Sequence, residues 1–306
     1  RDSIGPLLGR MEAHNVHKLK AEWWVGTVLP ANWKIAMEAF MEGYHVMTTH
    51  PQLQDIVPQL YDGMYKFPRK DQLELVDQSK SLRENVDEQL ESMKRLSDGM
   101  DGMLHRKELE IAYTLADVDN LGMEFPEDKN MAMMMWLGVV QDQISKRLQA
   151  QGEPVPDLNT VCQTDPVNAV EFLFPHYFLL PYFSSFSAYR IRPLGPESCF
   201  FELWSLTTYP EDTDHEVPME PTMLPYDSEK FPPIPRQDYS NIPLNQVGLH
   251  AKGFEYMRLS KDVEGMVSNF HRLLDGYLAG VPAEKLAHAN QMLAGNFDGV
   301  IKDLEF

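Results

Sequence analysis

The pattern of apolar and polar positions predicts a strand near the start of the chain, followed at once by a helix. Residues 21–29, AEWWVGTVL, are rich in the aromatic and β-branched side chains that favour strands. Pro30 and Asn32 then predict a helix start, because an Asn side chain accepts hydrogen bonds from the exposed N–H groups of a first helical turn. Residues 1–20 are mixed and predict an edge segment or a linker, and an apparent loop follows at 61–72.

Two helical patterns occupy the middle of the chain, and we interpret about 80–155 as a helical insertion. In the first, apolar side chains recur at helical spacing opposite charged ones, at Leu82, Val86, Leu90, Met93 and Leu96. The second runs from about Asp128 to Ala150 and ends before Gly152 and Pro154. Its methionine cluster either lines an adaptable pocket or packs the helix against a sheet, and consists of Met131, Met133, Met134 and Met135.

The sheet itself is predicted in the second half of the chain. Residues 170–191 and 199–209 are rich in aromatic side chains and alternate in places, which predicts strands, and the segment 194–197 predicts the turn between them. Residues 210–235 contain seven prolines and many acids, a composition typical of a surface loop.

Two further helices are predicted near the C-terminus. Apolar side chains at helical spacing mark the first over 262–278, and the second begins at Pro282 and stops near Gly295. With 306 residues, 43% of them hydrophobic, the chain can bury a large core, and we expect one α+β domain over residues 1–306.

Composition excludes some classes of partner. The net charge of −19 argues against nucleic acids and anionic membranes. The longest apolar run, Met131 to Val140, is too short to span a bilayer. The first ten residues, RDSIGPLLGR, have no apolar signal core, so we expect a cytoplasmic protein.

The helix predicted after the first strand carries the candidate chemistry. Glu38, Glu42 and His45 follow one another at spacings of four and three, so they share one helix face. His50 lies about 140° away on an ideal helix, but Pro51 disfavours the helical conformation there, so the chain can fold both imidazoles toward one atom. Paired imidazoles suit iron, zinc or copper. Since the chain contains ten histidines, however, such a pair is common by chance, and its spacing alone is a weak signal.

The whole string NWKIAMEAFMEGYHVMTTHP is more specific. It resembles the mononuclear-iron segment of the Rieske-type ring-hydroxylating oxygenases, in their large (alpha) subunit. The shared elements are an opening Asn-Trp-Lys, a carboxylate three residues before the first histidine, and Tyr-His-x4-His-Pro; here they are Asn32, Trp33, Lys34, Glu42, Tyr44, His45, His50 and Pro51. The resemblance implies a helix-grip (START/Bet v1-like) α+β fold, with a curved antiparallel sheet around a long C-terminal helix.

The resemblance also implies a metal site and its third ligand. Fe(II) would be held by His45, His50 and a carboxylate from the mouth of the C-terminal helix, leaving positions open for O2. Asp238 matches the family pattern, because Asn241 follows three residues later and Gln246 a few residues further on. The position before it, where the family often has a second acid, is Gln237, and competing loop acids are Asp212, Asp214 and Asp227.

Glu42 matches a family carboxylate, more often Asp, that bridges ligand histidines across a subunit interface for electron transfer. A carboxylate that accepts from the free N–H of a ligand imidazole fixes its tautomer and orientation. The alternative is a buried Glu paired with an Arg or a His.

The cysteine count bears on the electron source. A Rieske cluster needs two Cys and two His in closely spaced pairs. The only cysteines, Cys162 and Cys199, have no His within three residues, so we expect no Rieske domain on this chain. The [2Fe–2S] cluster is then needed in trans or on a missing N-terminal domain, with a ferredoxin and reductase or a Rieske domain as donor. The resemblance further implies a homo-oligomer, a trimer by family habit.

The activity implied is an oxygenase that uses Fe(II) and O2 to hydroxylate, once or twice, or oxidatively demethylate a hydrophobic, aromatic substrate. Pocket candidates flank the ligands or lie on the central strands, and are Ala39, Phe40, Val46, His176 and Phe178. His176 replaces the Asn of a family Phe-Pro-Asn triplet, and is either a pocket residue or an ordinary core or surface histidine.

Two other functions are compatible with the sequence. A helix-grip protein can bind an apolar ligand without chemistry, in which case both histidines are incidental. A zinc hydrolase can use the same two histidines and one aspartate, although the sequence contains no HExxH motif. The substrate, the reaction among the three named, and the natural donor are not specified by the motif.

Overall fold

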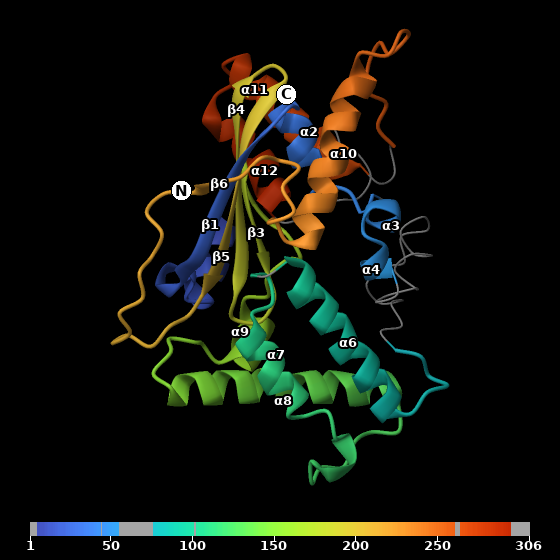
Figure 1. The fold of residues 1–306 in the computed structure, drawn as a ribbon, viewed down its shortest axis with the longest axis vertical. Helices are drawn as coiled ribbons and strands as arrows, with labels where there is room; N and C mark the ends of the chain where they lie inside the picture. Colours follow the sequence, from blue (N-terminus) through green and yellow to red (C-terminus); the bar gives the residue numbers. More distant parts are fainter. Residues whose placement is uncertain (1–4, 44, 55–75, 101, 261–263, 295–306) are drawn as a thin grey trace.

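A computed structural model describes residues 5–43, 45–54, 76–100, 102–260 and 264–294. Its centre is a six-stranded sheet in the order β2-β3-β4-β5-β1-β6 (Figure 1). The strands are β1 (Lys20–Leu29), β2 (Glu171–Leu173), β3 (Tyr177–Pro181), β4 (Phe186–Gly195), β5 (Ser198–Thr207) and β6 (Thr222–Met223). Neighbouring strands are antiparallel, except that β6 runs parallel to β1.

One face of the sheet is covered by the helices that carry the site. Helix α2 (Trp33–Glu38) packs against β4 and β5, and α10 (Pro233–Leu249) packs against α2. The main core lies between these helices and the sheet, and its largest buried side chains include Phe178, Tyr189, Phe201, Tyr239 and Phe270. The short helices α3 (Val46–Thr49) and α4 (Pro51–Gln54) lie beside α10 (Figure 1).

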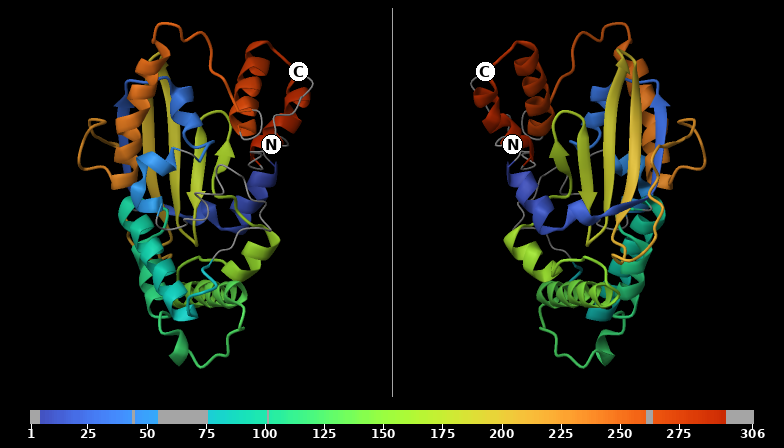
Figure 2. Two further views of the ribbon diagram at one scale, coloured as in Figure 1. Left: turned by 90° about the vertical axis from the view of Figure 1, so that its right-hand side faces the viewer. Right: turned by 90° about the vertical axis from the view of Figure 1, so that its left-hand side faces the viewer.

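Helices α11 (Gly265–Leu278) and α12 (Ala283–Ala294) form a pair at one end of the molecule (Figure 2). The N-terminal α1 (Gly5–Ala13) and the 3-10 turn η2 (Val16–Lys18) lead into β1. Side chains of this segment, Met11 and Val16 among them, pack against Phe186 in a separate small cluster.

The opposite end of the molecule is helical and has its own core (Figure 2). It consists of α6 (Leu82–Met100), α7 (Arg106–Tyr113), the 3-10 turn η4 (Val118–Asn120), α8 (Lys129–Ala150) and α9 (Leu158–Thr164). Trp136 is fully buried there, and its indole N–H donates to the Leu115 carbonyl at 2.9 Å. Within the described residues, no helix is long and apolar enough to cross a membrane.

The α+β helix-grip fold is confirmed, as are most of the predicted elements. The first strand, both helical patterns of the middle region, the turn before β5 and the last two helices occur close to their predicted bounds. Helix α10 stands where the resemblance implied the mouth of a long helix carrying Asp238, although no helical pattern was identified there; α1 stands where an edge segment or linker was expected. The predicted loop at 61–72 lies outside the described residues.

Candidate metal centre and its cavity

Two histidines and one aspartate from distant parts of the chain meet at one point. One ligand atom each from His45, His50 and Asp238 lies within 4.8 Å of the others. Oδ1 of Asp238 is 3.0 Å from Nε2 of His50 and 3.7 Å from Nε2 of His45. Asp238 and His50 are buried, and His45 is half-buried. No other group of three potential metal ligands occurs in the part of the chain that the structure describes.

The histidine segment folds differently from the single helix predicted for it. The Asn32 side chain caps α2 as expected, accepting from the Lys34 N–H at 3.0 Å, but α2 ends at Glu38. A new short helix starts after His45, whose backbone N–H donates to Oε2 of Glu42 at 3.1 Å. The carboxylate thus replaces the helical acceptor that this N–H lacks, and the break turns His45 toward α10.

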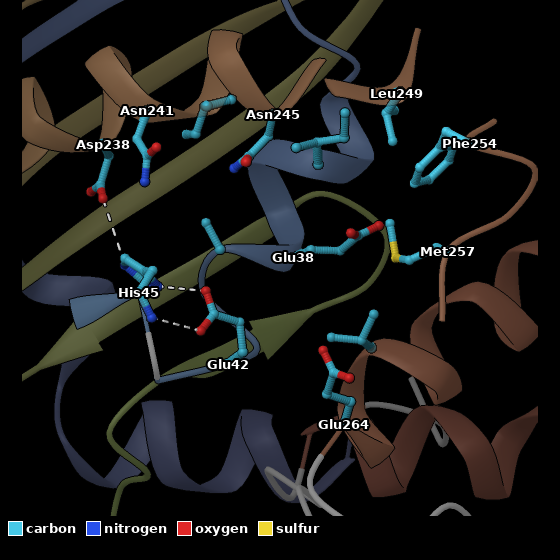
Figure 3. A pocket seen from close by; sticks show the side chains of 14 residues that line it. Glu38, Glu42, His45, Asp238, Asn241, Asn245, Leu249, Phe254, Met257 and Glu264 are labelled. Carbon is cyan, nitrogen blue, oxygen red and sulfur yellow. Dashed lines mark hydrogen bonds and ion pairs between the residues drawn. The ribbon is translucent and has the colours of Figure 1, made fainter. Parts of the chain in front are cut away.

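Glu42 also orients the imidazole of His45. Its Oε1 lies 2.6 Å from Nδ1 of His45, close enough for a strong charge-assisted hydrogen bond. A carboxylate only accepts, so Nδ1 carries the proton and Nε2 presents its lone pair toward Asp238. This is the arrangement of a ligand imidazole held by a carboxylate behind it (Figure 3).

His50 is held in the same sense by a neutral partner. Its Nδ1 lies 2.8 Å from Oε1 of Gln237, while its Nε2 faces Asp238. A neutral imidazole has a single N–H, so it cannot donate to both acceptors. Either a second proton on Nε2 or a metal ion between Nε2 and the carboxylate removes this conflict. Burial opposes protonation of His50, but the hydrogen bond and negative charge of Asp238 outweigh it and raise the pKa of His50. Two imidazole lone pairs and one carboxylate converge here, a donor set that fits Fe(II).

The amide of Gln237 is itself oriented by Gln52. Nε2 of Gln52 donates to Oε1 of Gln237 at 2.8 Å, and Nε2 of Gln237 donates back to Oε1 of Gln52 at 3.1 Å. The sequence pattern marked Gln237 only as a departure from the acid often found at this position. The structure places it behind His50, as Glu42 lies behind His45.

Two polar contacts fix α10 against residues 32–50, the segment that contains both histidines. Nδ2 of Asn241 donates to Oγ1 of Thr49 at 3.0 Å, and Oε1 of Gln246 accepts from the backbone N–H of Asn32 at 2.8 Å. These are the Asn and Gln that accompany Asp238 in the motif. Their contacts hold the helix that carries the carboxylate at a fixed register relative to both histidines.

A cavity of about 260 Å³ opens beside two of the candidate ligands, His45 and Asp238 (Figure 3). Its polar lining comes from Glu38, Glu42, His45, Asp238, Asn241, Asn245 and Glu264. Its apolar lining comes from Ile35, Ala39, Ile242, Leu249, Phe254, Met257 and Val267. The cavity lies between α2, α10 and the start of α11, and Glu42 is part of its wall.

Of the five predicted substrate-binding residues, Ala39 lines this cavity. Phe40 and Phe178 contact one another instead, with ring centroids 4.2 Å apart in the core between α2 and the sheet. Val46 begins α3, and His176 lies half-buried in the turn between β2 and β3, where burial lowers its pKa. The substrate contacts of these residues stay a prediction.

The competing loop acids lie elsewhere. Asp212, Asp214 and Asp227 are exposed and do not belong to the ligand group. Sequence reasoning missed His271 on α11, whose Nε2 lies 2.6 Å from Oε1 of Glu38 in the cavity wall. No motif marks His271, because its neighbours on α11 follow an ordinary amphipathic pattern.

A sheet covered by α2 and α10, with two histidines and a carboxylate beside a cavity, is an arrangement typical of mononuclear non-haem iron oxygenases. The family model described as ring hydroxylating alpha subunit (catalytic domain) matches residues 8–280. The chain belongs to this family and is an oxidoreductase of the non-haem iron oxygenase type. A search of curated proteins finds no match to it.

Proposed function

We propose that this chain is the catalytic part of a Rieske-type oxygenase that hydroxylates, once or twice, or oxidatively demethylates a hydrophobic, aromatic substrate. The proposal rests above all on one observation: Nε2 of both histidines and a buried carboxylate oxygen converge within 4.8 Å at the edge of a cavity. We further propose that residues 1–306 form one catalytic domain with a helical insertion at about 80–155.

The residues of the site have different roles in this proposal. His45, His50 and Asp238 would hold Fe(II), which when bound supplies the capacity to activate O2. Glu42 and Gln237 each accept from the Nδ1–H of one histidine and keep its Nε2 directed at the metal position. The cavity beside them positions the substrate and limits access of water.

Glu42 is also the proposed point of electron entry. Its side chain lines the cavity and contacts His45 through two hydrogen bonds. Electrons would come from a Rieske [2Fe–2S] cluster held in trans or on a separate N-terminal domain, served by a ferredoxin and reductase. A trimer would bring such a cluster from a neighbouring subunit.

The two other functions fit the site less well. A binding protein without chemistry gives no reason to bury Asp238 against two imidazole nitrogens. A zinc hydrolase requires the same ligands, and only the metal preference separates it from the oxygenase. The deciding experiment is the EPR spectrum of the anaerobic, Fe(II)-loaded chain with nitric oxide. We expect a high-spin iron–nitrosyl signal; a folded protein that gives none would overturn the proposal.

Replacing the acceptor behind His50 should weaken metal binding. Gln237→Met removes the amide oxygen that fixes the Nδ1–H tautomer, and we expect affinity for Fe(II) or Co(II) to fall by about 10- to 100-fold. Gln237→Glu keeps an acceptor at this place and should retain the affinity. Both are measured by anaerobic metal titration, with circular dichroism as the check on folding.

Asn241→Leu provides the matched control for Gln237→Met. It removes an amide from the same helix that contacts Thr49 rather than an imidazole, so it measures the effect of loosening α10 alone, and its loss of metal affinity should be smaller than that of Gln237→Met. Equal losses in both variants would point to a general loosening of α10 and would contradict a specific role for Gln237.

Turnover should require a separate cluster. The purified chain with a reductase and NADH alone is expected to give no sustained product, because Cys162 and Cys199 cannot supply a Rieske ligand set. Product analysis with and without a Rieske protein checks this. Many turnovers in its absence would refute the inference from the cysteine count.

A further inference from the structure

The metal centre does not use two of the carboxylates that line the cavity, Glu38 and Glu264, and Glu38 is the one that extends across it. Glu38 is the last residue of α2, and its side chain is 12% exposed. Figure 3 shows this side chain extending away from His45 toward Met257, across the cavity. Within the described residues, Oε1 accepts from Nε2 of His271, and no hydrogen bond to Oε2 is found.

This leaves an ionisable acceptor on the cavity wall with capacity for one more partner. His271 is on α11 and Glu38 on α2, so their contact joins the two helices and fixes one oxygen of the carboxylate. A partly buried carboxylate oxygen without a protein partner loses much of its hydration, and a ligand that donates to it recovers that interaction.

Half of the residues that line the cavity with Glu38 are apolar. They include Ile35, Leu249, Phe254, Met257 and Val267. Such walls favour a molecule that is mostly hydrophobic, with its polar part confined to one place. Phe254 and Met257 are partly exposed, at 44% and 43%, so they form the outer side of the cavity.

The charge of the lining discriminates between polar groups. Among the described residues that line the cavity, Glu38, Glu42, Asp238 and Glu264 are acids, and none is a lysine or an arginine. An anionic group placed next to Glu38 would meet a like charge, whereas a hydroxyl or an ammonium would donate to it.

From these observations we propose that the substrate is an aromatic molecule with one hydrogen-bond donor, a hydroxyl or an amine, that binds Glu38. Aromatic carboxylates are rejected. The proposal rests on the proposed function, and it adds an orientation: with the donor group on Glu38, the opposite end of the ring system points to His45 and Asp238. Oxidation therefore occurs on the part of the molecule remote from the donor.

Four matched probes test this with the wild-type chain: 1-naphthylmethylamine, 1-naphthol, 1-methylnaphthalene and 1-naphthoate. They share one ring system and differ in a single substituent. Binding to the metal-loaded protein is measured by calorimetry. The amine and the alcohol should bind about 10- to 100-fold more tightly than the methyl compound, and the carboxylate weakest of all. Equal affinities, or tightest binding of the carboxylate, would overturn the proposal.

Glu38→Gln then assigns the preference to one residue. The amide keeps an acceptor oxygen but loses the charge, so the amine should lose about 10-fold or more in affinity while the alcohol changes less. The control is Glu264→Gln, a second acid of the cavity lining whose carboxylate accepts the backbone N–H of Ser260. Equal effects of both substitutions would indicate that the acids of the cavity act through their combined negative charge, and would refute a direct contact of the ligand with Glu38.

The oxygenase proposal and the substrate proposal can be refuted separately. If the iron–nitrosyl signal is present but the four probes bind alike, the substrate proposal is wrong and the oxygenase proposal stands. If the signal is absent, the oxygenase proposal fails whatever the order of affinities. Should Glu38→Gln not fold, the order of the probes in the wild-type chain still decides the question.

Discussion

Asp238→Ala is expected to abolish activity and to remove the iron–nitrosyl signal. The carboxylate is the only acidic member of the ligand group, and two imidazoles alone leave the metal without charge compensation. Because a metal contributes several kcal/mol to such reactions, turnover should fall by about 10³-fold or more. Metal analysis after desalting and EPR of the nitric oxide complex measure both effects.

The matched control for this change is Asp227→Ala. Asp227 is an exposed acid of the loop before α10 and lies outside the ligand group, so its loss should leave iron content and signal unchanged. An unchanged signal in Asp238→Ala would leave the oxygenase proposal standing but would show that another carboxylate is the metal ligand. Circular dichroism checks folding, which we expect to persist because, within the described residues, the side-chain contacts found for Asp238 are those with the two histidines.

Substitution of Glu42 is expected to have the second large effect on activity. Its variants separate two roles of this side chain, the positioning of His45 and the transfer of electrons. In Glu42→Gln, one of the two carboxylate oxygens becomes an NH2 group, which cannot accept from whichever donor it faces, the backbone N–H or the Nδ1–H of His45. Metal affinity should fall by about 10- to 100-fold through the loss of orientation. If Glu42 also carries electrons, turnover driven by NADH and a Rieske protein should remain depressed even when the metal site is saturated.

A peroxide-driven single turnover isolates the electron-transfer role. It bypasses the cluster, so metal-saturated Glu42→Gln should retain it while losing most NADH-driven activity. Glu42→Asp keeps the charge on a shorter side chain and should be less impaired than Glu42→Gln. Full NADH-driven turnover of metal-saturated Glu42→Gln would leave Glu42 with only the positioning of His45.

Elements whose local signals agree with their tertiary environment could be predicted from the sequence. The strand at 20–29 and the capping role of Asn32 depend on side chains next to them in the chain. Helix α10 was implied by the resemblance alone, because its residues show no clear helical pattern, and this has a physical reason. Its buried positions include Asp238 and Gln246, so the buried stripe is not an apolar stripe, and Pro243 lies inside it. Polar residues that serve the site thus conceal the periodicity of the helix that carries them.

The lining of the cavity was less predictable than the ligands. Phe40 and Phe178 were selected for their closeness to the motif or to the central strands, yet their rings contact one another in the core. Because α2 ends at Glu38, a helical extrapolation gives the wrong direction for the residues that follow. His271 comes from a helix far along the chain, and only the packing of α11 beside α2 brings it to Glu38.

The contacts of Asn241 with Thr49 and of Gln246 with Asn32 have a consequence for how the protein matures. They join residues 192 and 214 positions apart, so the third ligand reaches the histidines only after the sheet between them has formed. Contacts of such long range form late in folding because they close large loops. A nascent chain therefore offers only a weak two-histidine site. The chain should therefore retain iron tightly only at the final step of maturation, when the whole domain has folded.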